Sequence, residues 1–327
     1  MPRFLSFFLP LFALPLASAL LVAGIEAAPA ASFPDRPIHL LVPYPPGGPN
    51  DVIARLIANR LDDKFGQVVV DNRPGGNGNI AVADVARAAP DGYTLVLPAM
   101  AYAVNPSLFA DVGYTFDQFT PVSIVTEGPL ILVVHPSLGV KSVKELIALA
   151  KREPGKINYG SGGNGSSLHL AAELFKSEAH VDLQHIPYKG TNDMIADLLT
   201  GRVSLAFISP LVAKPYVAHG DLIALGITSA ERSAGWPDIP TIAEAGVPGY
   251  AMQAWYAVLA PKATPSAVVG ALSDAVAQAV KSPDVSTKLQ SLGNAPVGSA
   301  PAEATAMIAQ EAKRWHDIIA AAGIKPE

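Results

Sequence analysis

The chain has 327 residues, of which 50% are hydrophobic and 16% charged, and it contains no cysteine. This composition is too apolar for a disordered protein, and the length suffices for two core-forming units at roughly 100–200 residues each. The lack of cysteine excludes disulfides, thiol chemistry and thiolate metal ligands. The 23 basic and 28 acidic side chains give a net charge of −5 without a basic block, which argues against a nucleic-acid partner.

The first thirty residues have the pattern of an export signal. Arg3 precedes an uncharged stretch, residues 4–25, that is rich in Leu, Phe and Ala and is followed by small residues up to Ala30. These three parts are typical of a secretory signal peptide. A transmembrane anchor is the alternative, but Pro10 and Pro15 interrupt the stretch. We therefore predict that residues 1–30 are cleaved and that the mature protein lies in the periplasm.

Strands and helices alternate along the next part of the chain. Short apolar runs at 39–43, 68–70 and 94–97 predict strands. Apolar residues at helical spacing predict helices over 51–65 and 80–88 between those strands. This βαβαβ order implies a parallel sheet with helices on its faces.

The remainder of the chain repeats the scheme. The predicted strands are 131–134, 157–159, 183–186, 203–207 and 222–227, and the predicted helices between them are 143–150, 167–175 and 193–200. A Pro-rich connection, an apolar segment at 254–259 and helices near 266–281 and 301–322 follow. Two α/β units of similar plan therefore fit the chain.

A short pattern occurs once in each half. Tyr44-Pro-Pro-Gly47-Gly48 and Tyr159-Gly-Ser-Gly162-Gly163 each come after a predicted strand and before a predicted helix. Each copy delivers backbone N–H groups at a helix N-terminus, where anions are favoured, to the carboxyl edge of a sheet. Two such edges facing each other would form a ligand cleft.

Seven motifs give the chain a family resemblance. They are YPPGGPND at 44–51, VVVDNRPGGNGNIA at 68–81, APDGYTL at 89–95, NPSLF at 105–109, INYGSGGNGSSLHLAAELF at 157–175, IPYKG at 186–190 and PTIAEAGVPGY at 240–250. Together they resemble the Bug-type substrate-binding proteins of tripartite tricarboxylate transporters. The resemblance runs from about residue 33 to the C-terminus.

The resemblance implies a periplasmic receptor of two α/β lobes that closes on one small solute and passes it to membrane permease subunits. We expect each lobe to be a mostly parallel sheet flanked by helices, with the ligand cleft between the lobes. The expected boundaries are 31–125 and 229–327 for a discontinuous lobe 1 and 126–228 for lobe 2. We expect a monomer without enzymatic activity, cofactor or metal.

In that family the solute, usually a carboxylate, lies between the turns that match 44–51 and 161–167. The predicted ligand-binding residues are Tyr44, Gly47, Gly48, Asp51, Ala99, Met100, Ser161, Gly162, Ser166, Ser167, Tyr188, Gly190 and Ser209. Turn formation by glycine and a helix cap at Ser167 are the simpler explanations for these residues taken singly. The apolar pair Ala99 and Met100 stands where the family usually has hydroxyl residues, which argues against a multiply charged solute.

Two cations have ordinary structural explanations. We interpret Lys189 as a solvated loop lysine or one paired with an acid, rather than as a counter-ion. Arg73 fits a fork that ties its loop to its own lobe. For Trp255, Tyr256 and Trp315 we expect packing within the lobes, although the first two could border the cleft.

Other functions find less support. Residues 160–165 satisfy G-x-G-x-x-G, but the acidic residue that a dinucleotide-binding oxidoreductase needs after the next strand is missing. Ser166, His169 and Asp182 lie close in sequence without a G-x-S-x-G elbow, and we interpret His169 with Glu173 as a pair on a helix surface. A periplasmic sensor-input protein remains open, because sequence does not separate it from a transport receptor.

Overall fold

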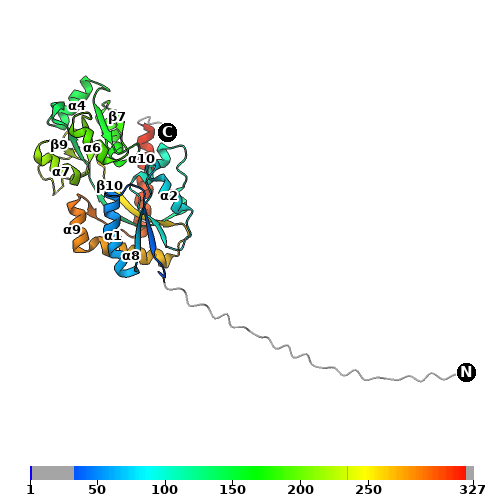
Figure 1. Cartoon of the computed structure of the whole chain (residues 1–327). Coiled ribbons are helices and arrows are strands. Elements are labelled where there is room, and N and C mark those ends of the chain that lie inside the picture. The colour runs from blue at the N-terminus through cyan, green and yellow to red at the C-terminus, as the bar shows by residue number, and fades with distance from the viewer. Residues whose placement is uncertain (2–32, 234, 322–327) are drawn as a thin grey trace. The chain divides into compact units, whose positions relative to one another are not determined.

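The computed structural model describes residues 1, 33–233 and 235–321, and its helices and strands are labelled in Figure 1. The predicted signal peptide lies outside the described residues, apart from Met1. Everything below concerns the unit Phe33–Glu327. It contains two β-sheets with helices packed around them, which confirms the predicted α/β class with two lobes.

The first lobe is built on a six-stranded sheet in the order β11-β4-β10-β3-β1-β2. Its strands are β1 (Ile38–Val42), β2 (Val68–Asn72), β3 (Thr94–Val96), β4 (Phe119–Gly128), β10 (Ala254–Pro261) and β11 (Ala295–Pro296). Its helices are α1 (Pro49–Phe65), α2 (Asn79–Ala86), α3 (Ala101–Leu108), α8 (Ser266–Lys281), α9 (Pro283–Ser291) and α10 (Pro301–Ala321), with 3₁₀ turns η1 (Gly76–Gly78) and η2 (Phe116–Gln118).

The second lobe is built on a five-stranded sheet in the order β7-β6-β8-β5-β9. Its strands are β5 (Ile131–Val134), β6 (Asn158–Ser161), β7 (Gln184–Pro187), β8 (Leu205–Ile208) and β9 (Ile223–Ile227). Its helices are α4 (Val143–Arg152), α5 (Ser167–Ala179), α6 (Thr191–Leu199) and α7 (Pro210–His219), with a 3₁₀ turn η3 (Pro136–Leu138). In Figure 1, α4, α6 and α7 gather around this sheet, whereas α1, α8 and α9 belong to the first.

Both sheets are mixed, where the sequence analysis expected mostly parallel ones. In the first sheet β1 pairs in parallel with β2 and β3, but β10 runs antiparallel to β3 and β4. In the second sheet β6 pairs in parallel with β7 and β8, but β5 runs antiparallel to β8 and β9. The antiparallel strands include those that lead from one lobe into the other. β4 runs towards the second lobe and β10 returns from it, so these two neighbouring strands of the first sheet run in opposite directions.

The chain passes between the lobes twice. It leaves the first sheet after β4 and returns to it at β10, after residues 228–253. The expected boundary at residue 126 falls inside β4, and the one at 228 falls directly after β9. The exact extent of each lobe stays a prediction.

Large apolar side chains fill the interior of both lobes. Trp255 and Trp315 are fully buried, in agreement with the packing role expected for them. In the first lobe, α8 packs against α1 and β4, and α10 packs against α3 and β4. These contacts hold α1 against the first lobe, with its N-terminus just after the carboxyl end of β1.

Candidate ligand-binding cleft

A cavity of about 390 Å³ is lined by residues of both lobes. Its walls come from the loops that follow β1, β3, β6, β7 and β8, from the β4–β5 connection, from the start of β10 and from the segment after α9. The carboxyl ends of parallel strands are the usual ligand site in α/β sheets. The cavity therefore lies where the sequence analysis expected a cleft.

Four helices begin at this cavity. Their N-cap residues are Gly48 for α1, Ser166 for α5, Gly190 for α6 and Ser209 for α7, and all four line it. The N–H groups in the first turn of a helix have no acceptor within the helix and carry a partial positive charge. The arrangement favours a bound anion without requiring a cationic side chain.

Asp51 stabilises the first-lobe turn, residues 43–48 between β1 and α1. Its Oδ2 accepts a hydrogen bond from the Gly47 N–H at 2.9 Å, and its Oδ1 accepts one from Asn72 Nδ2 at 3.0 Å and lies 2.9 Å from Arg55 Nη2. Burial raises the pKa of Asp51, but the hydrogen bonds from Arg55, Gly47 and Asn72 outweigh it and lower the pKa overall. Asp51 is buried and does not line the cavity, so it holds the turn that does.

The second-lobe turn joins β6 to α5. The Ser166 Oγ accepts a hydrogen bond from the backbone N–H of His169 at 3.3 Å, so Ser166 caps the helix and the expected cap at Ser167 is wrong. Ser161 is fully buried, and its Oγ lies 2.6 Å from His185 Nε2. Gly162, Ser166 and Ser167 line the cavity, whereas Ser161 does not.

The structure places the remaining candidates in two groups. Met100 is fully buried in the core, and the Tyr188 hydroxyl donates to Asp197 Oδ2 at 2.8 Å, so neither lines the cavity. Burial, with Asp197, raises the pKa of the Tyr188 phenol to about 12. The nine candidates brought together at the cavity are Tyr44, Gly47, Gly48, Ala99, Gly162, Ser166, Ser167, Gly190 and Ser209.

Apolar and aromatic groups make up much of the wall; sequence reasoning placed Tyr44 and Ala99 there and left Tyr256 open, but it missed the leucines. Among them are Leu211, which is 44% exposed, and Leu292. Tyr256 lies beside Tyr44, and burial raises the pKa of both phenols, that of Tyr256 to about 12. The alternation of side chains along β10 could have indicated that Tyr256 and Ala254 share one face.

Lys189 and Asp193 are the charged side chains among the described residues that line the cavity, and their charges cancel. Arg73 lies elsewhere, with its Nη1 3.1 Å from Asp84 Oδ2 of α2. That pair ties the loop after β2 to its own lobe, as the sequence analysis favoured. Charge at the cleft is therefore supplied mainly by backbone groups.

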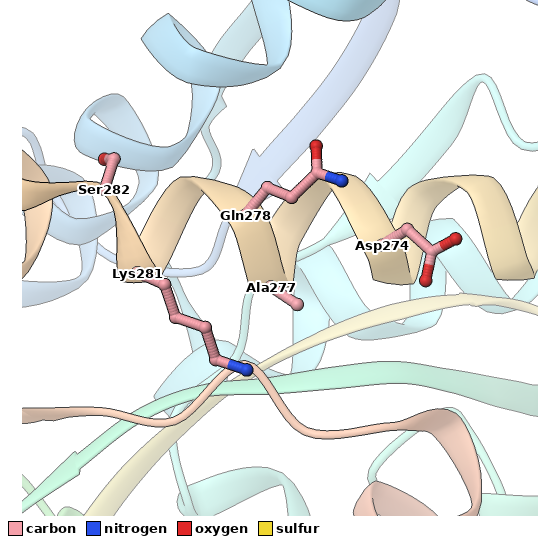
Figure 2. A pocket seen from close by; sticks show the side chains of 5 residues that line it. All are labelled: Asp274, Ala277, Gln278, Lys281 and Ser282. Carbon is pink, nitrogen blue, oxygen red and sulfur yellow. The ribbon is translucent and has the colours of Figure 1, made fainter.

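A second hollow, of about 480 Å³, runs along α8 and is shown in Figure 2. It is lined by Asp274, Ala277, Gln278, Lys281 and Ser282. Asp274, Gln278 and Lys281 are exposed to solvent on the helix surface. It does not bring separate elements together as the inter-lobe cavity does.

The contacts of His169 do not support the hydrolase alternative considered for Ser166, His169 and Asp182. His169 directs its Nδ1 to the Gly165 N–H at 3.0 Å, so its imidazole is not paired with the Ser166 hydroxyl. His169 and Glu173 are buried, which corrects the expected pair on a helix surface. Within the described ranges, no cluster of three or more His, Cys, Asp or Glu could hold a metal ion, and no helix is long and apolar enough to cross a membrane.

Two α/β lobes around an inter-lobe cavity are the architecture of periplasmic solute-binding proteins. Residues 53–324 match the tripartite tricarboxylate transporter family receptor, TctC, and the chain belongs to this family. It is 38% identical over 308 residues to Protein BugT of Bordetella pertussis, covering 93% of this chain and 94% of BugT. The resemblance inferred from the motifs is thereby confirmed.

Solved structures agree with this assignment. R. palustris Rpa4515 with adipate is 38% identical, with a TM-score of 0.84 that covers 90% of this chain and all (100%) of the other. MatC from Rhodopseudomonas palustris with bound malate is 32% identical, with a TM-score of 0.80 that covers 88% of this chain and 100% of MatC. Members of the family are solute-binding receptors, and such proteins are not enzymes.

Proposed function

We propose that this protein is a periplasmic receptor that captures one small carboxylate between its lobes and delivers it to the membrane permease of a tripartite tricarboxylate-type transporter. The observation that carries the proposal is the convergence of four helix N-termini on one cavity. The relatives solved with adipate and with malate support the ligand class.

Helix termini alone do not supply enough affinity. Each contributes roughly 0.3–1 kcal/mol to anion binding, so four give about 1–4 kcal/mol. Micromolar affinity requires about 8 kcal/mol. Hydrogen bonds to a desolvated ligand and apolar contact with Tyr44, Tyr256 and Leu211 supply the remainder as the lobes close.

The wall of the cavity favours an acid with an apolar body. Lys189 and Asp193 offset each other, and Leu211 and Leu292 offer apolar surface beside the hydroxyl and amide side chains of the wall. A short aliphatic or aromatic carboxylate satisfies both the helix termini and this wall.

The first experiment is native mass spectrometry of the purified protein, followed by identification of any small molecule released on unfolding. One stoichiometric carboxylate supports the proposal, whereas an NAD mass or a chemically altered compound contradicts it. For an empty protein, thermal shifts with adipate, malate and benzoate follow, since a ligand at about 100 Kd stabilises by about 2.7 kcal/mol. Deleting the gene then separates transport, which loses uptake, from a sensor-input role, which does not.

A further inference from the structure

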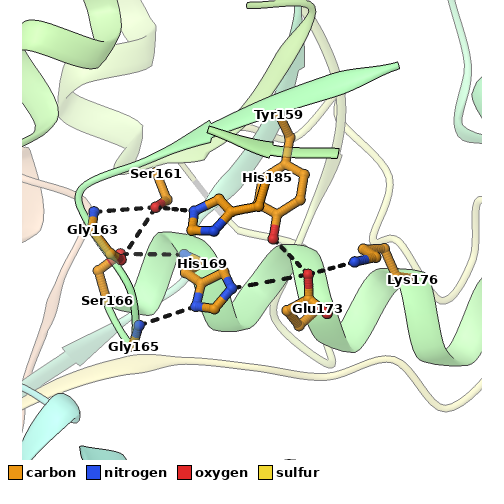
Figure 3. A network of polar contacts seen from close by, with 9 residues as sticks. All are labelled: Tyr159, Ser161, Gly163, Gly165, Ser166, His169, Glu173, Lys176 and His185. Atoms are coloured by element: carbon orange, nitrogen blue, oxygen red, sulfur yellow. Dashed lines mark hydrogen bonds and ion pairs between the residues drawn. The ribbon is translucent and has the colours of Figure 1, made fainter. Parts of the chain in front are cut away.

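A buried polar network lies under the second-lobe turn and does not line the cavity (Figure 3). Its members come from three elements, Tyr159 of β6, His169 and Glu173 of α5, and His185 of β7. The Tyr159 hydroxyl donates to Glu173 Oε1 at 2.5 Å, and Lys176 Nζ donates to the same oxygen at 2.7 Å. Buried polar groups are costly unless they are satisfied, so such a network specifies one arrangement of the groups it touches.

The two histidines hold the turn at separate points. His169 Nδ1 accepts the Gly165 N–H at 3.0 Å, which puts the proton of this neutral ring on Nε2. His185 Nε2 lies 2.6 Å from Ser161 Oγ, and that oxygen also accepts the Gly163 N–H at 3.1 Å. The two imidazoles stack with their centroids 4.1 Å apart. The network thus fixes both the beginning and the end of the turn.

Burial, nearly complete for His169 and partial for His185, disfavours the charged form of both histidines. It lowers the pKa of His169 to about 4, with Lys176 adding to the effect. It also lowers the pKa of His185 to about 3, where His169 and Lys176 add to the effect and Glu173 opposes it. A neutral His169 can accept the Gly165 N–H, which a protonated ring cannot do.

The opposite side of the turn faces the first lobe. A Cβ atom on Gly165 would lie 2.7 Å from Asn77 Nδ2, 2.8 Å from Leu108 Cδ1 and 3.0 Å from Asn105 Oδ1. Asn105 is itself fixed, because its Nδ2 donates to Asn79 Oδ1 at 2.6 Å and its Oδ1 accepts from Asn77 Nδ2 at 2.9 Å. The turn is therefore held between the buried network and an asparagine cluster across the lobe interface.

We propose that His169, whose Nε2 lies 3.9 Å from the Glu173 oxygen that accepts the Tyr159 hydroxyl, is a positioning residue for solute binding. It fixes the Gly162–Ser167 turn so that Gly162, Ser166 and Ser167 line the cavity and Gly165 meets the first lobe. The inference rests on the proposed function, because it assigns a role in the affinity of that same site. It does not involve chemistry at Ser161, whose hydroxyl is fully buried.

The test compares His169→Leu, which removes the acceptor, with His169→Asn, whose Oδ1 replaces Nδ1. NMR measures hydrogen exchange of the Gly165 amide in the ligand-free protein, with the β8 amides as internal reference. Calorimetry measures the Kd of adipate, and urea unfolding measures stability. Leu272→Ala is the control for lost stability, since Leu272 of α8 belongs to the hydrophobic core of the first lobe and not to the network in the second.

We expect the Gly165 amide to exchange at least about tenfold faster in His169→Leu, and the adipate Kd to rise by at least about tenfold. His169→Asn should recover most of both effects, whereas Leu272→Ala should lower stability and leave the Kd within about twofold. Should His169→Leu fail to fold, Tyr159→Phe provides a milder loss from the same network, with faster exchange at Gly165 as the expected result.

Two results would overturn the inference. One is unchanged Gly165 exchange in a folded His169→Leu or Tyr159→Phe protein. The other is an equal loss of adipate affinity in Leu272→Ala, because general destabilisation would then explain the effect. If the parent protein binds none of adipate, malate and benzoate, the proposed ligand class is wrong, and the exchange of the Gly165 amide still tests whether His169 fixes the turn.

Discussion

Replacing Gly165 by alanine should weaken solute binding because the new methyl group meets the first lobe. Gly165 has φ +73°, which costs a side chain roughly 1–2 kcal/mol. The methyl would also overlap Asn77, Leu108 and Asn105, and the hydrogen bond between the two asparagines keeps them from swinging away. Overpacking of this kind costs roughly 1–3 kcal/mol. Opening the lobes relieves the overlap, so this second cost falls on the closed, ligand-bound state.

Gly139 offers a matched control. It also has φ +73°, and a Cβ atom there would have no neighbour within 4 Å. Gly139→Ala therefore carries the backbone strain without the overlap, and the adipate Kd of Gly165→Ala should exceed that of the control by about 5- to 150-fold. Calorimetric titration of both variants measures the ratio. Equal Kd values in the two variants would refute the reasoning, because strain alone would then account for the change.

Three further predictions concern the first-lobe turn and pH. Gly48→Val should raise the adipate Kd at least about tenfold, because the new side chain blocks the approach to the turn that lines the cavity. Its stability in urea should change little, since Gly48 has an ordinary φ of −78° and a Cβ there meets Pro45 O at 3.5 Å. An unchanged Kd would remove this turn from the site. Asp51→Asn should cost about 1.5–3 kcal/mol of unfolding free energy by weakening charged hydrogen bonds, and an unaltered urea midpoint would contradict that role. The unfolding free energy should fall as the pH drops from 6.5 towards 4. The slope should reach up to about 1.4 kcal/mol per pH unit for each of His169 and His185, because each ring binds a proton in the unfolded chain and not in the folded one. His169→Asn should remove about half of that slope, and a parent and variant with parallel pH profiles would show that His169 does not titrate in this way.

Elements with clear periodicity were predictable from sequence. The helix ended by Gly66 and the strands of the second sheet lie close to where their apolar patterns indicated. The prediction omitted β4, α3, α7, α9 and the short β11. The first three contain an internal proline, namely Pro121, Pro106 and Pro215. Proline weakens the local signal, whereas packing in the folded chain tolerates it at these positions.

The candidate site was predictable where function depends on a turn followed by a helix. Ser209 shows the limit, since it was predicted as a ligand-binding residue without the helix that follows it: Ser209 is the N-cap of α7, with Pro210 at the first helical position. The burial of His169 was not predictable, because His169 lies on α5 and its partner His185 on β7, and the two rings meet only when the second lobe is folded. Spacing within one helix carries no information about such contacts.

Recognition by backbone N–H groups has a consequence for how this receptor could change its preference. Almost any residue supplies the same N–H group, so a substitution at a helix terminus leaves the anion-binding end intact provided that its side chain, unlike that of Gly48→Val, does not block the approach of the ligand. The apolar wall can vary separately, and Leu211 and Leu292 stand on it. Under the proposed function the site would therefore have two separable parts: the helix N-termini would recognise the carboxylate, and the apolar wall, which can change by substitution, would set which carbon skeleton fits beside it. Biosensors for different acids could be selected by randomising those two leucines while the turns stay as they are.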